Sequence, residues 1–419
     1  MLDSESESEF DCPDAHIDTI YSKVVNKFSF RQSSLSIAPV ITLTMPETFR
    51  QFRTTQDGLD NLHQTTAELP KIKNNEVLVK IHTVSLNYRD TEGTWESDVE
   101  SRHESDAFTA VCMGTYGHHK SIVPDESRSL VPCSDMCGTI QSMGSEAAQC
   151  WKNGQRVLSI FNQSHLSGQI TATDMGSGLG LPLEGVLAEY RAFDMRGLVA
   201  VPDYLTDEEA CTLPIAAVTA WTSMNWMRPV GQHVQGADTV VLLQGTGGVA
   251  IAGLQIAKAS GLTAIITSSS DEKLEKARAL GADHTVNYRT TPDWHEQVMK
   301  LTDGKGADII LETGGAETLS KSFECVAFGG LISAIGYLSG KEDAPGKRPN
   351  MNVLALKRNV TFKGILNGPK DRFEEMLELY ASKEIRPVVD RVFKFDESRN
   401  ALKYLYSGNH LGKVVIKVA

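Results

Sequence analysis

The residues best suited to bind a ligand form a glycine-rich loop in the second half of the chain. An apolar run, TVVLLQ, leads directly into Gly245-Thr246-Gly247-Gly248-Val249, and an apolar helix pattern follows. In such a loop Gly245 can take a sharp turn, and Gly247 lets the backbone come close to a pyrophosphate. The amides at the start of the helix would supply donors and a partial positive charge for the phosphates. The spacing predicts a dinucleotide site, with a ligand-free tight turn as the alternative.

A second polar cluster follows the next apolar strand and bears on the type of dinucleotide. NAD sites usually place Asp or Glu at this strand end to bind ribose hydroxyls. This chain has Ser268 and Ser269 there, Lys273 in the next helix, and Tyr288 at the end of the third strand. Hydroxyls and a lysine suit a 2′-phosphate, which a carboxylate would repel. The pattern favours NADPH over NADH, with a solvated Lys273 as the alternative. Asp271 is interpreted as the cap of the helix.

The elements around these residues predict an α/β fold with two domains. From 202 to 361 apolar strands alternate with amphipathic helices, which is typical of a doubly wound parallel sheet, the Rossmann arrangement. The preceding segment, 45–201, has many short strand-like runs punctuated by glycine and is predicted to be β-rich. Residues 362–419 return to mixed strand and helix, and residues 1–44, which start with a Ser/Glu alternation, are predicted to form a disordered tail.

Composition limits the partners and the compartment. The chain has 419 residues, a formal net charge of −12, 41% hydrophobic and 22% charged residues, and seven scattered cysteines. The acidic balance favours neither nucleic acid nor an anionic membrane. No apolar run is long enough for a transmembrane helix, and the first residues lack the pattern of a signal peptide. We therefore expect a cytoplasmic protein that acts on a small-molecule substrate, with reduced thiols.

Several segments match one known family in its own order. They are SLNYRD, VPCSDMCGTIQSMG, LPIAAVTAWTSM, QGTGGVA, SSSDEKLEKARALGAD, VNYR and HLGKVVIKV. With them the chain resembles the medium-chain dehydrogenase/reductase superfamily, and within it the zinc-free quinone oxidoreductase-like branch. The resemblance implies a GroES-like catalytic domain around an inserted Rossmann domain, NADPH-dependent reduction of quinones or enals in the cleft between them, and a homo-oligomer. We expect a dimer, with an edge strand near 331–337 as its seam.

The resemblance also implies roles for individual residues. Asn87 matches the cleft asparagine near the nicotinamide, and Thr219 matches the threonine that contacts the cofactor at the first helix. Lys273 and Tyr288 match the pair that recognises the 2′-phosphate. The remaining cofactor-binding positions that it implies are Gly336, Tyr337 and Lys413.

A catalytic metal is not expected. Zinc members of the superfamily hold the ion with a cysteine, a His-Glu pair and a further cysteine or histidine. By the matching motifs, this chain has Asn87 at the cysteine position and Ser134-Asp135 in place of the His-Glu pair. Ile215 lies near the third ligand position. An amide, a hydroxyl and an alkyl group cannot hold tetrahedral zinc.

Without a Lewis acid, conjugate reduction of an enone or quinone is easier than reduction of a simple carbonyl, because the charge spreads onto a distant oxygen. Asn87, Tyr88 and Tyr116 are the candidates for polarising the acceptor or relaying a proton, and each tyrosine alternatively packs with its hydroxyl satisfied. Asp90 is expected to be a buried structural partner. A polar insertion at about 91–110 adjoins this site and is either a lid or a gene-model artefact.

Two other functions stay open at this point. One is a biosynthetic enoyl reductase of secondary metabolism or an alcohol dehydrogenase-like enzyme. The other is a non-catalytic NADPH-binding regulatory protein, for which tight cofactor binding without turnover would be diagnostic.

Overall fold

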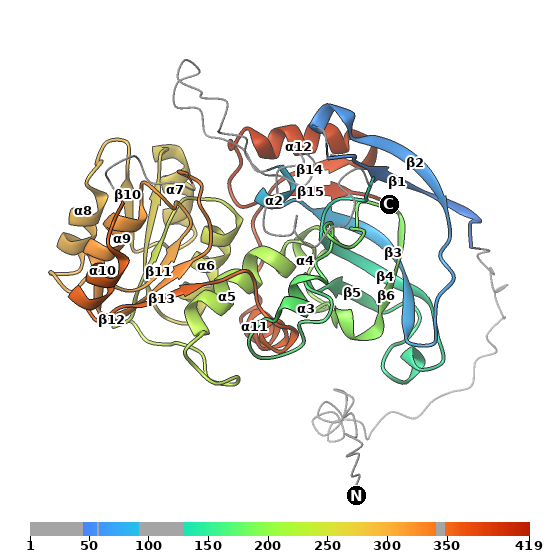
Figure 1. The fold of residues 1–419 in the computed structure, drawn as a ribbon, viewed down its shortest axis with the longest axis horizontal. Coiled ribbons are helices and arrows are strands. Elements are labelled where there is room, and N and C mark those ends of the chain that lie inside the picture. Colours follow the sequence, from blue (N-terminus) through green and yellow to red (C-terminus); the bar gives the residue numbers. More distant parts are fainter. Residues whose placement is uncertain (1–44, 57, 92–128, 341–347) are drawn as a thin grey trace, which may run out of the picture.

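The structure is a computed structural model that describes residues 45–56, 58–91, 129–340 and 348–419. Outside this range lie three predicted features: the tail 1–44, the insertion beyond Thr91, and Tyr116. The described chain forms two bodies, each built around a β-sheet (Figure 1).

The first body is a parallel sheet with helices on both faces. Its strand order is β10-β9-β8-β11-β12-β13, and every neighbouring pair runs parallel. The strands are β8 (Val240–Leu243), β9 (Thr263–Ser268), β10 (His284–Asn287), β11 (Ala307–Glu312), β12 (Val326–Ala334) and β13 (Thr361–Gly364). The helices are α6 (Gly248–Ala259), α7 (Asp271–Ala279), α8 (Trp294–Leu301), α9 (Leu319–Cys325) and α10 (Met351–Lys357). Every residue of β8 is buried, as a strand covered on both faces requires. The predicted Rossmann arrangement is confirmed.

The edge of this sheet differs from the expectation. β12 lies between β11 and β13, so residues near 331–337 are not at an edge, and that part of the prediction is wrong. The edge strand is β13. The sequence pattern did not reveal it, because this short strand alternates apolar and polar residues instead of forming a continuous apolar run. β13 also carries the sheet past the boundary predicted at residue 361.

The second body is a mainly antiparallel sheet of order β14-β15-β3-β4-β5-β7, with β6 paired to β3. Its strands are β3 (Glu76–Ser85), β4 (Asp135–Met143), β5 (Arg156–Ser159), β6 (Tyr190–Asp194), β7 (Leu198–Ala200), β14 (Val389–Lys394) and β15 (Lys413–Lys417). β1 (Thr48–Arg53) and β2 (His63–Glu68) form a separate antiparallel pair. Because β15 pairs with β3, the C-terminal segment returns to the sheet that the N-terminal half of the chain builds.

Helices and a shared core join the two bodies. The connecting elements are α4 (Asp207–Ala210), a π-helical turn (Leu213–Ala217), α5 (Val218–Asn225) and α11 (Lys370–Lys383). The remaining helices are α2 (Tyr88–Thr91), α3 (Ala172–Met175) and α12 (Ser398–Tyr406). One hydrophobic cluster contains Leu158 and Val415 of the mixed sheet and Val241 of the parallel sheet. In the described part of the chain, no helix has the length and apolar character needed to cross a bilayer.

Candidate active site

The glycine-rich loop lies at the carboxyl end of β8, directly before α6. Gly245 has φ 79°, a conformation that glycine adopts without strain, and its amide donates to Thr267 Oγ1 at 3.3 Å. Gly247 is the N-cap of α6. A Cβ added at Gly245 or Gly247 would meet no atom within 4 Å, so the space in front of the helix N-terminus is open. This geometry fits a pyrophosphate held by the helix amides.

The next glycine has the opposite surroundings. A Cβ at Gly248 would come within 2.6 Å of Lys413 Cδ and 3.2 Å of Ala216 Cβ. The amide of Gly412 donates to the Thr246 carbonyl at 3.0 Å. The start of β15 therefore lies directly against the loop, and the two bodies of the molecule meet at this point.

The predicted 2′-phosphate region lies at the ends of β9 and β10. Ser268 is buried, and its carbonyl accepts a hydrogen bond from the Tyr288 amide at 3.0 Å. Ser269 is half-buried, and the Tyr288 side chain is exposed. No carboxylate occupies the last residues of β9, whose sequence is TAIITS.

The N-cap of the helix that follows lies one residue before the predicted cap. Ser270 is the N-cap of α7, because its hydroxyl accepts from the Lys273 amide at 3.4 Å. Asp271 instead accepts a hydrogen bond from Asn287 Nδ2 at 2.7 Å. The interpretation of Asp271 as the cap is therefore wrong; serine and aspartate are similarly good caps, and the sequence alone does not rank them.

Lys273 is not a solvated helix residue. Its Nζ donates to the carbonyls of Gly408 and His410, each at 2.9 Å. Burial lowers the pKa of Lys273. An ammonium has three N–H groups, so one remains after these two bonds. Lys273 thus links α7 to the segment between α12 and β15, and Gly412 of that segment contacts the glycine-rich loop.

A buried carboxylate that sequence reasoning missed organises the adjacent strand ends. Glu312, the last residue of β11, is 2% exposed. Its oxygens accept hydrogen bonds from the amides of Gly314 and Gly315, the hydroxyls of Thr318 and Ser322, and the side-chain amide of Gln244. Gln244 Oε1 in turn accepts from the Thr313 amide at 3.0 Å. The sequence signal for this network was the polar residue at the end of two apolar strands, Gln244 after β8 and Glu312 at the end of β11.

The loop after β12 packs against this network. The Gly336 amide donates to the Glu312 carbonyl at 3.3 Å, and a Cβ at Gly336 would lie 2.9 Å from the Thr313 carbonyl. Tyr337 contacts Gly315 closely enough that only glycine fits there. Gly336 and Tyr337 therefore lie at the same edge of the parallel sheet as the phosphate loop.

In the second body, strand register brings three distant residues together. β15 pairs Val415 with Ser85, and β3 pairs Ser85 with Asp135. Two residues further along, Lys413 comes opposite Asn87, and its Nζ lies 2.5 Å from both Asn87 Oδ1 and the Leu86 carbonyl. All of these polar groups are buried.

The charges of this cluster are coupled. Asp135 accepts from Ser134 Oγ at 2.8 Å and from the Ile215 amide at 3.1 Å. Burial raises the pKa of Asp135, and Lys413 and Asn87 oppose that rise. Burial lowers the pKa of Lys413, and the carboxylates of Asp135 and Asp90 oppose that change.

Asp90 has the structural role that was expected. It is fully buried and accepts from the Asn87 amide at 2.8 Å, and Arg89 Nη1 lies 3.8 Å from its carboxylate. Burial raises the pKa of Asp90 to about 6. Nearby, Cys133 has φ 69°, a strained conformation of the kind often found at functional sites.

The other predicted residues have varied positions. Thr246 is buried in the loop, and Val249 packs on the core that joins the two bodies. Thr219 is buried in α5, and its hydroxyl donates to Asn367 Oδ1 at 3.4 Å. Tyr88 is 37% exposed at the start of α2. Its contact with an acceptor stays a prediction.

The residues at the zinc position do not fit a metal ion. Asn87 offers an amide oxygen that already accepts from the Lys413 ammonium. The Ser134 hydroxyl donates a hydrogen bond to Asp135, and Ile215 contributes only a backbone amide. Among the described residues, no group of three histidine, cysteine or acidic side chains is arranged to hold a metal. An ammonium at the centre of the set would also repel a dication.

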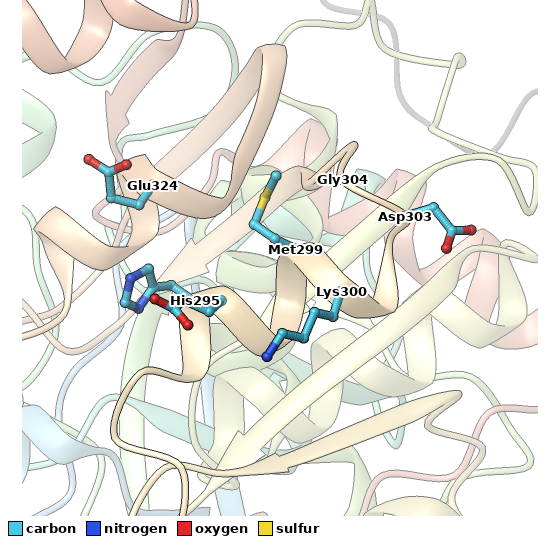
Figure 2. Close-up of a pocket in the computed structure, with 7 residues that line it drawn as sticks. His295, Met299, Lys300, Asp303, Gly304 and Glu324 are labelled. Carbon is cyan, nitrogen blue, oxygen red and sulfur yellow. The ribbon is translucent and has the colours of Figure 1, made fainter.

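A separate hollow of about 610 Å³ lies on the outer surface of the Rossmann body. Figure 2 shows His295, Met299 and Lys300 of α8 on one side and Glu324 of α9 on the other. None of the predicted site residues lines this hollow, so it is separate from the glycine-rich loop at the carboxyl ends of the strands.

A Rossmann sheet with an open phosphate loop, meeting a β-rich body at a buried polar cluster, defines a two-domain nucleotide-dependent oxidoreductase. Two family models agree: "Alcohol dehydrogenase GroES-like domain" matches residues 73–203, and "Zinc-binding dehydrogenase" matches residues 248–382. The chain belongs to the medium-chain dehydrogenase/reductase superfamily, and the resemblance seen in the sequence is confirmed at that level.

Individual relatives cover most of the chain. A zinc-type alcohol dehydrogenase-like protein of Schizosaccharomyces pombe is 36% identical over 365 residues, which are 86% of this chain and 96% of that protein. A solved putative alcohol dehydrogenase from Sinorhizobium meliloti is 34% identical, with a TM-score of 0.75, and covers 90% of this chain and 100% of its own. A solved NAD-dependent alcohol dehydrogenase is 26% identical, with a TM-score of 0.71, over 88% of this chain and 100% of its own.

Proposed function

We propose that the protein reduces quinones or α,β-unsaturated carbonyl compounds with a hydride from NADPH, without a zinc ion. The observation that carries this proposal is the buried Lys413 ammonium, 2.5 Å from Asn87 Oδ1, at the position where zinc members of the superfamily bind metal. A cationic donor suits an acceptor whose oxygen becomes negative during hydride transfer.

The choice of NADPH is supported by the chemistry at the end of β9. That strand ends in Ser268 without a carboxylate, and the ammonium of Lys273 lies next to the loop with one N–H to spare. A 2′-phosphate carries negative charge and would gain from this cation. One relative with a solved structure is named as NAD-dependent, so the cofactor must be tested directly.

The test of the cofactor is a fluorescence titration with NADPH and with NADH. Lys273→Ala should weaken NADPH binding by roughly 10-fold or more, since a charge-assisted hydrogen bond is lost, and should leave NADH binding unchanged. Lys276→Ala is the matched control, because Lys276 lies one turn further along α7 and is paired with Glu272 at the surface. Equal affinity of the wild-type protein for both nucleotides would contradict the NADPH assignment.

The test of the reaction is NADPH oxidation with a panel of quinones and enones. We expect turnover that survives exhaustive chelation, measured on protein whose metal content is determined by mass spectrometry. Loss of activity on chelation, restored by zinc, would contradict the metal-free mechanism. Tight NADPH binding without turnover on any acceptor would favour the non-catalytic regulatory protein.

We further propose that the protein forms a homodimer through β13. The outer side of this strand has no partner strand in the described chain, and Phe328 and Leu356 beside it are 78% and 80% exposed. Unpaired strand edges and apolar patches are favourable sites for self-association. Light scattering should give a dimer, and Leu356→Glu should shift it to the monomer; a wild-type monomer would contradict this assignment.

A further inference from the structure

We propose that Lys413 is a catalytic residue, whose ammonium stabilises the negative charge that forms on the acceptor's oxygen and then supplies the proton that neutralises it. This inference rests on the proposed reduction of quinones or enones. It gives Lys413 a different role from the cofactor contact that the resemblance implied.

The position of Lys413 spans the two halves of the site. Its aliphatic stem packs on Gly248, where an added Cβ would be only 2.6 Å from Lys413 Cδ, at the first residue of α6. Its Nζ reaches Asn87 and Leu86 at the end of β3. The side chain therefore runs from the phosphate loop to the asparagine expected beside the nicotinamide, which is where a hydride acceptor would bind.

The contact with Lys413 also determines how Asn87 is oriented. An ammonium can only donate hydrogen bonds, so the Asn87 oxygen must face Lys413 and its NH2 group must face away. Asn87 is 7% exposed, and its NH2 group faces the Asp135 carboxyl, whose pKa this side-chain contact lowers. Asn87 and Asp135 thus hold the Lys413 ammonium in place, and this ammonium is the proposed donor to the oxyanion.

Several ionisable groups face the Lys413 ammonium. The groups that act on its ammonium are the carboxylates of Asp135 and Asp90, the thiols of Cys133 and Cys211, and His410. Burial lowers the pKa of Lys413, whereas the two carboxylates favour its charged form. A lowered pKa makes an ammonium release its proton more readily than a lysine in water does.

The step balances with the groups named. In the proposed step NADPH would supply a hydride, one proton with two electrons, to the electrophilic carbon of the acceptor, and the cofactor would become oxidised. The C=C electron pair shifts toward the carbonyl, which gives an enolate or a hydroquinone anion whose oxygen faces Lys413. A proton from the Lys413 ammonium then neutralises this anion, and water returns the proton to the amine. No other oxidant or reductant is needed.

Kinetics of matched variants test the role. Lys413→Met keeps the stem but removes the charge, so kcat should fall by ~100-fold or more, as on loss of an oxyanion donor, while NADPH affinity changes far less. Lys413→Arg should retain part of kcat and move the alkaline limb of the pH profile upward, because arginine does not titrate there. Lys417→Met on the exposed end of β15 is the control and should behave as wild type.

A binding experiment tests the same role without turnover. We expect 4-nitrophenol bound to the protein–NADP⁺ complex to ionise at lower pH than in water, followed by its phenolate absorbance, and Lys413→Met to abolish the shift. A shift in the wild type together with no turnover on any quinone or enone would keep the oxyanion site and reject the proposed acceptors. No shift in the wild type, no binding, or a Lys413→Met variant that loses NADPH affinity but keeps kcat would overturn the inference. Thermal unfolding of each variant reports whether it folds.

Discussion

The two halves of the candidate active site are built in different ways. The phosphate edge comes from one continuous strand–loop–helix, β8 to α6, whose chemistry is the backbone of Gly245 to Gly248. The cluster opposite it uses side chains of Asn87, Asp135 and Lys413, which only strand register brings together. A site built from backbone amides tolerates many different neighbouring side chains, but it loses its ligand when an added Cβ fills the ligand's place. A site built from buried side chains depends instead on the balance of their charges.

The largest expected effect is the loss of NADPH affinity when the open space at the glycine-rich loop is filled. Gly247→Val adds a side chain where a Cβ meets nothing within 4 Å, so the protein should fold normally but lose NADPH affinity by ~100-fold or more, because the pyrophosphate space is filled. Calorimetric titration and thermal unfolding measure the two effects. Gly364→Val on β13, which also has open space, is the matched control. Unchanged affinity in Gly247→Val would place the pyrophosphate elsewhere.

The next effect concerns the buried carboxylate that supports the phosphate edge. Glu312→Gln replaces an acceptor oxygen by an NH2 group that faces other donors, so the free energy of unfolding should fall by about 3 kcal/mol. Urea unfolding measures the change. Ser322→Ala removes one donor from the same network and should cost about 1 kcal/mol. A Glu312→Gln variant as stable as wild type would mean that this edge does not depend on side-chain charge.

A third effect lies between the two halves, at His410. Burial, together with the charges of Lys273 and Lys413, lowers the pKa of His410 to about 4. The unfolded chain binds a proton near pH 6.5 and the folded chain only near 4, so stability should fall as the pH drops through this window. His410→Gln should remove on the order of 2–3 kcal/mol of that fall between pH 6.5 and 4.

Urea unfolding at several pH values between 4 and 7 measures the difference between this variant and wild type. His63→Gln, at an exposed position of β2, should leave the pH dependence unchanged. Identical slopes for His410→Gln and wild type would mean that the imidazole is not buried beside the two lysines.

The smallest effect decides the role of Thr219. Its hydroxyl makes a long hydrogen bond to Asn367, so Thr219→Val should cost less than about 1 kcal/mol of stability. If the hydroxyl also binds the cofactor, as the resemblance implies, NADPH affinity should fall several-fold in the same titration. Unchanged affinity would leave Thr219 a packing residue of α5 alone.

Much of the fold could be predicted because the signals are local. Buried strands alternating with amphipathic helices mark a parallel sheet over 240–364, and the glycine loop stands between a strand and a helix. The edge strand was misplaced because β13 is short and alternately exposed, and the cap at Asp271 because Ser270 competes for the same role.

The sequence by itself determined the class of fold, the phosphate loop and the absence of zinc ligands at the expected positions. These depend on residue types at fixed short spacings, and backbone geometry follows from them directly. Only the tertiary structure decided that Lys413 reaches Asn87, that Lys273 binds the loop at Gly408 and His410, and that Glu312 gathers its donors. Such contacts depend on strand register and on the burial of charge. Both are determined by residues that lie far apart in the chain.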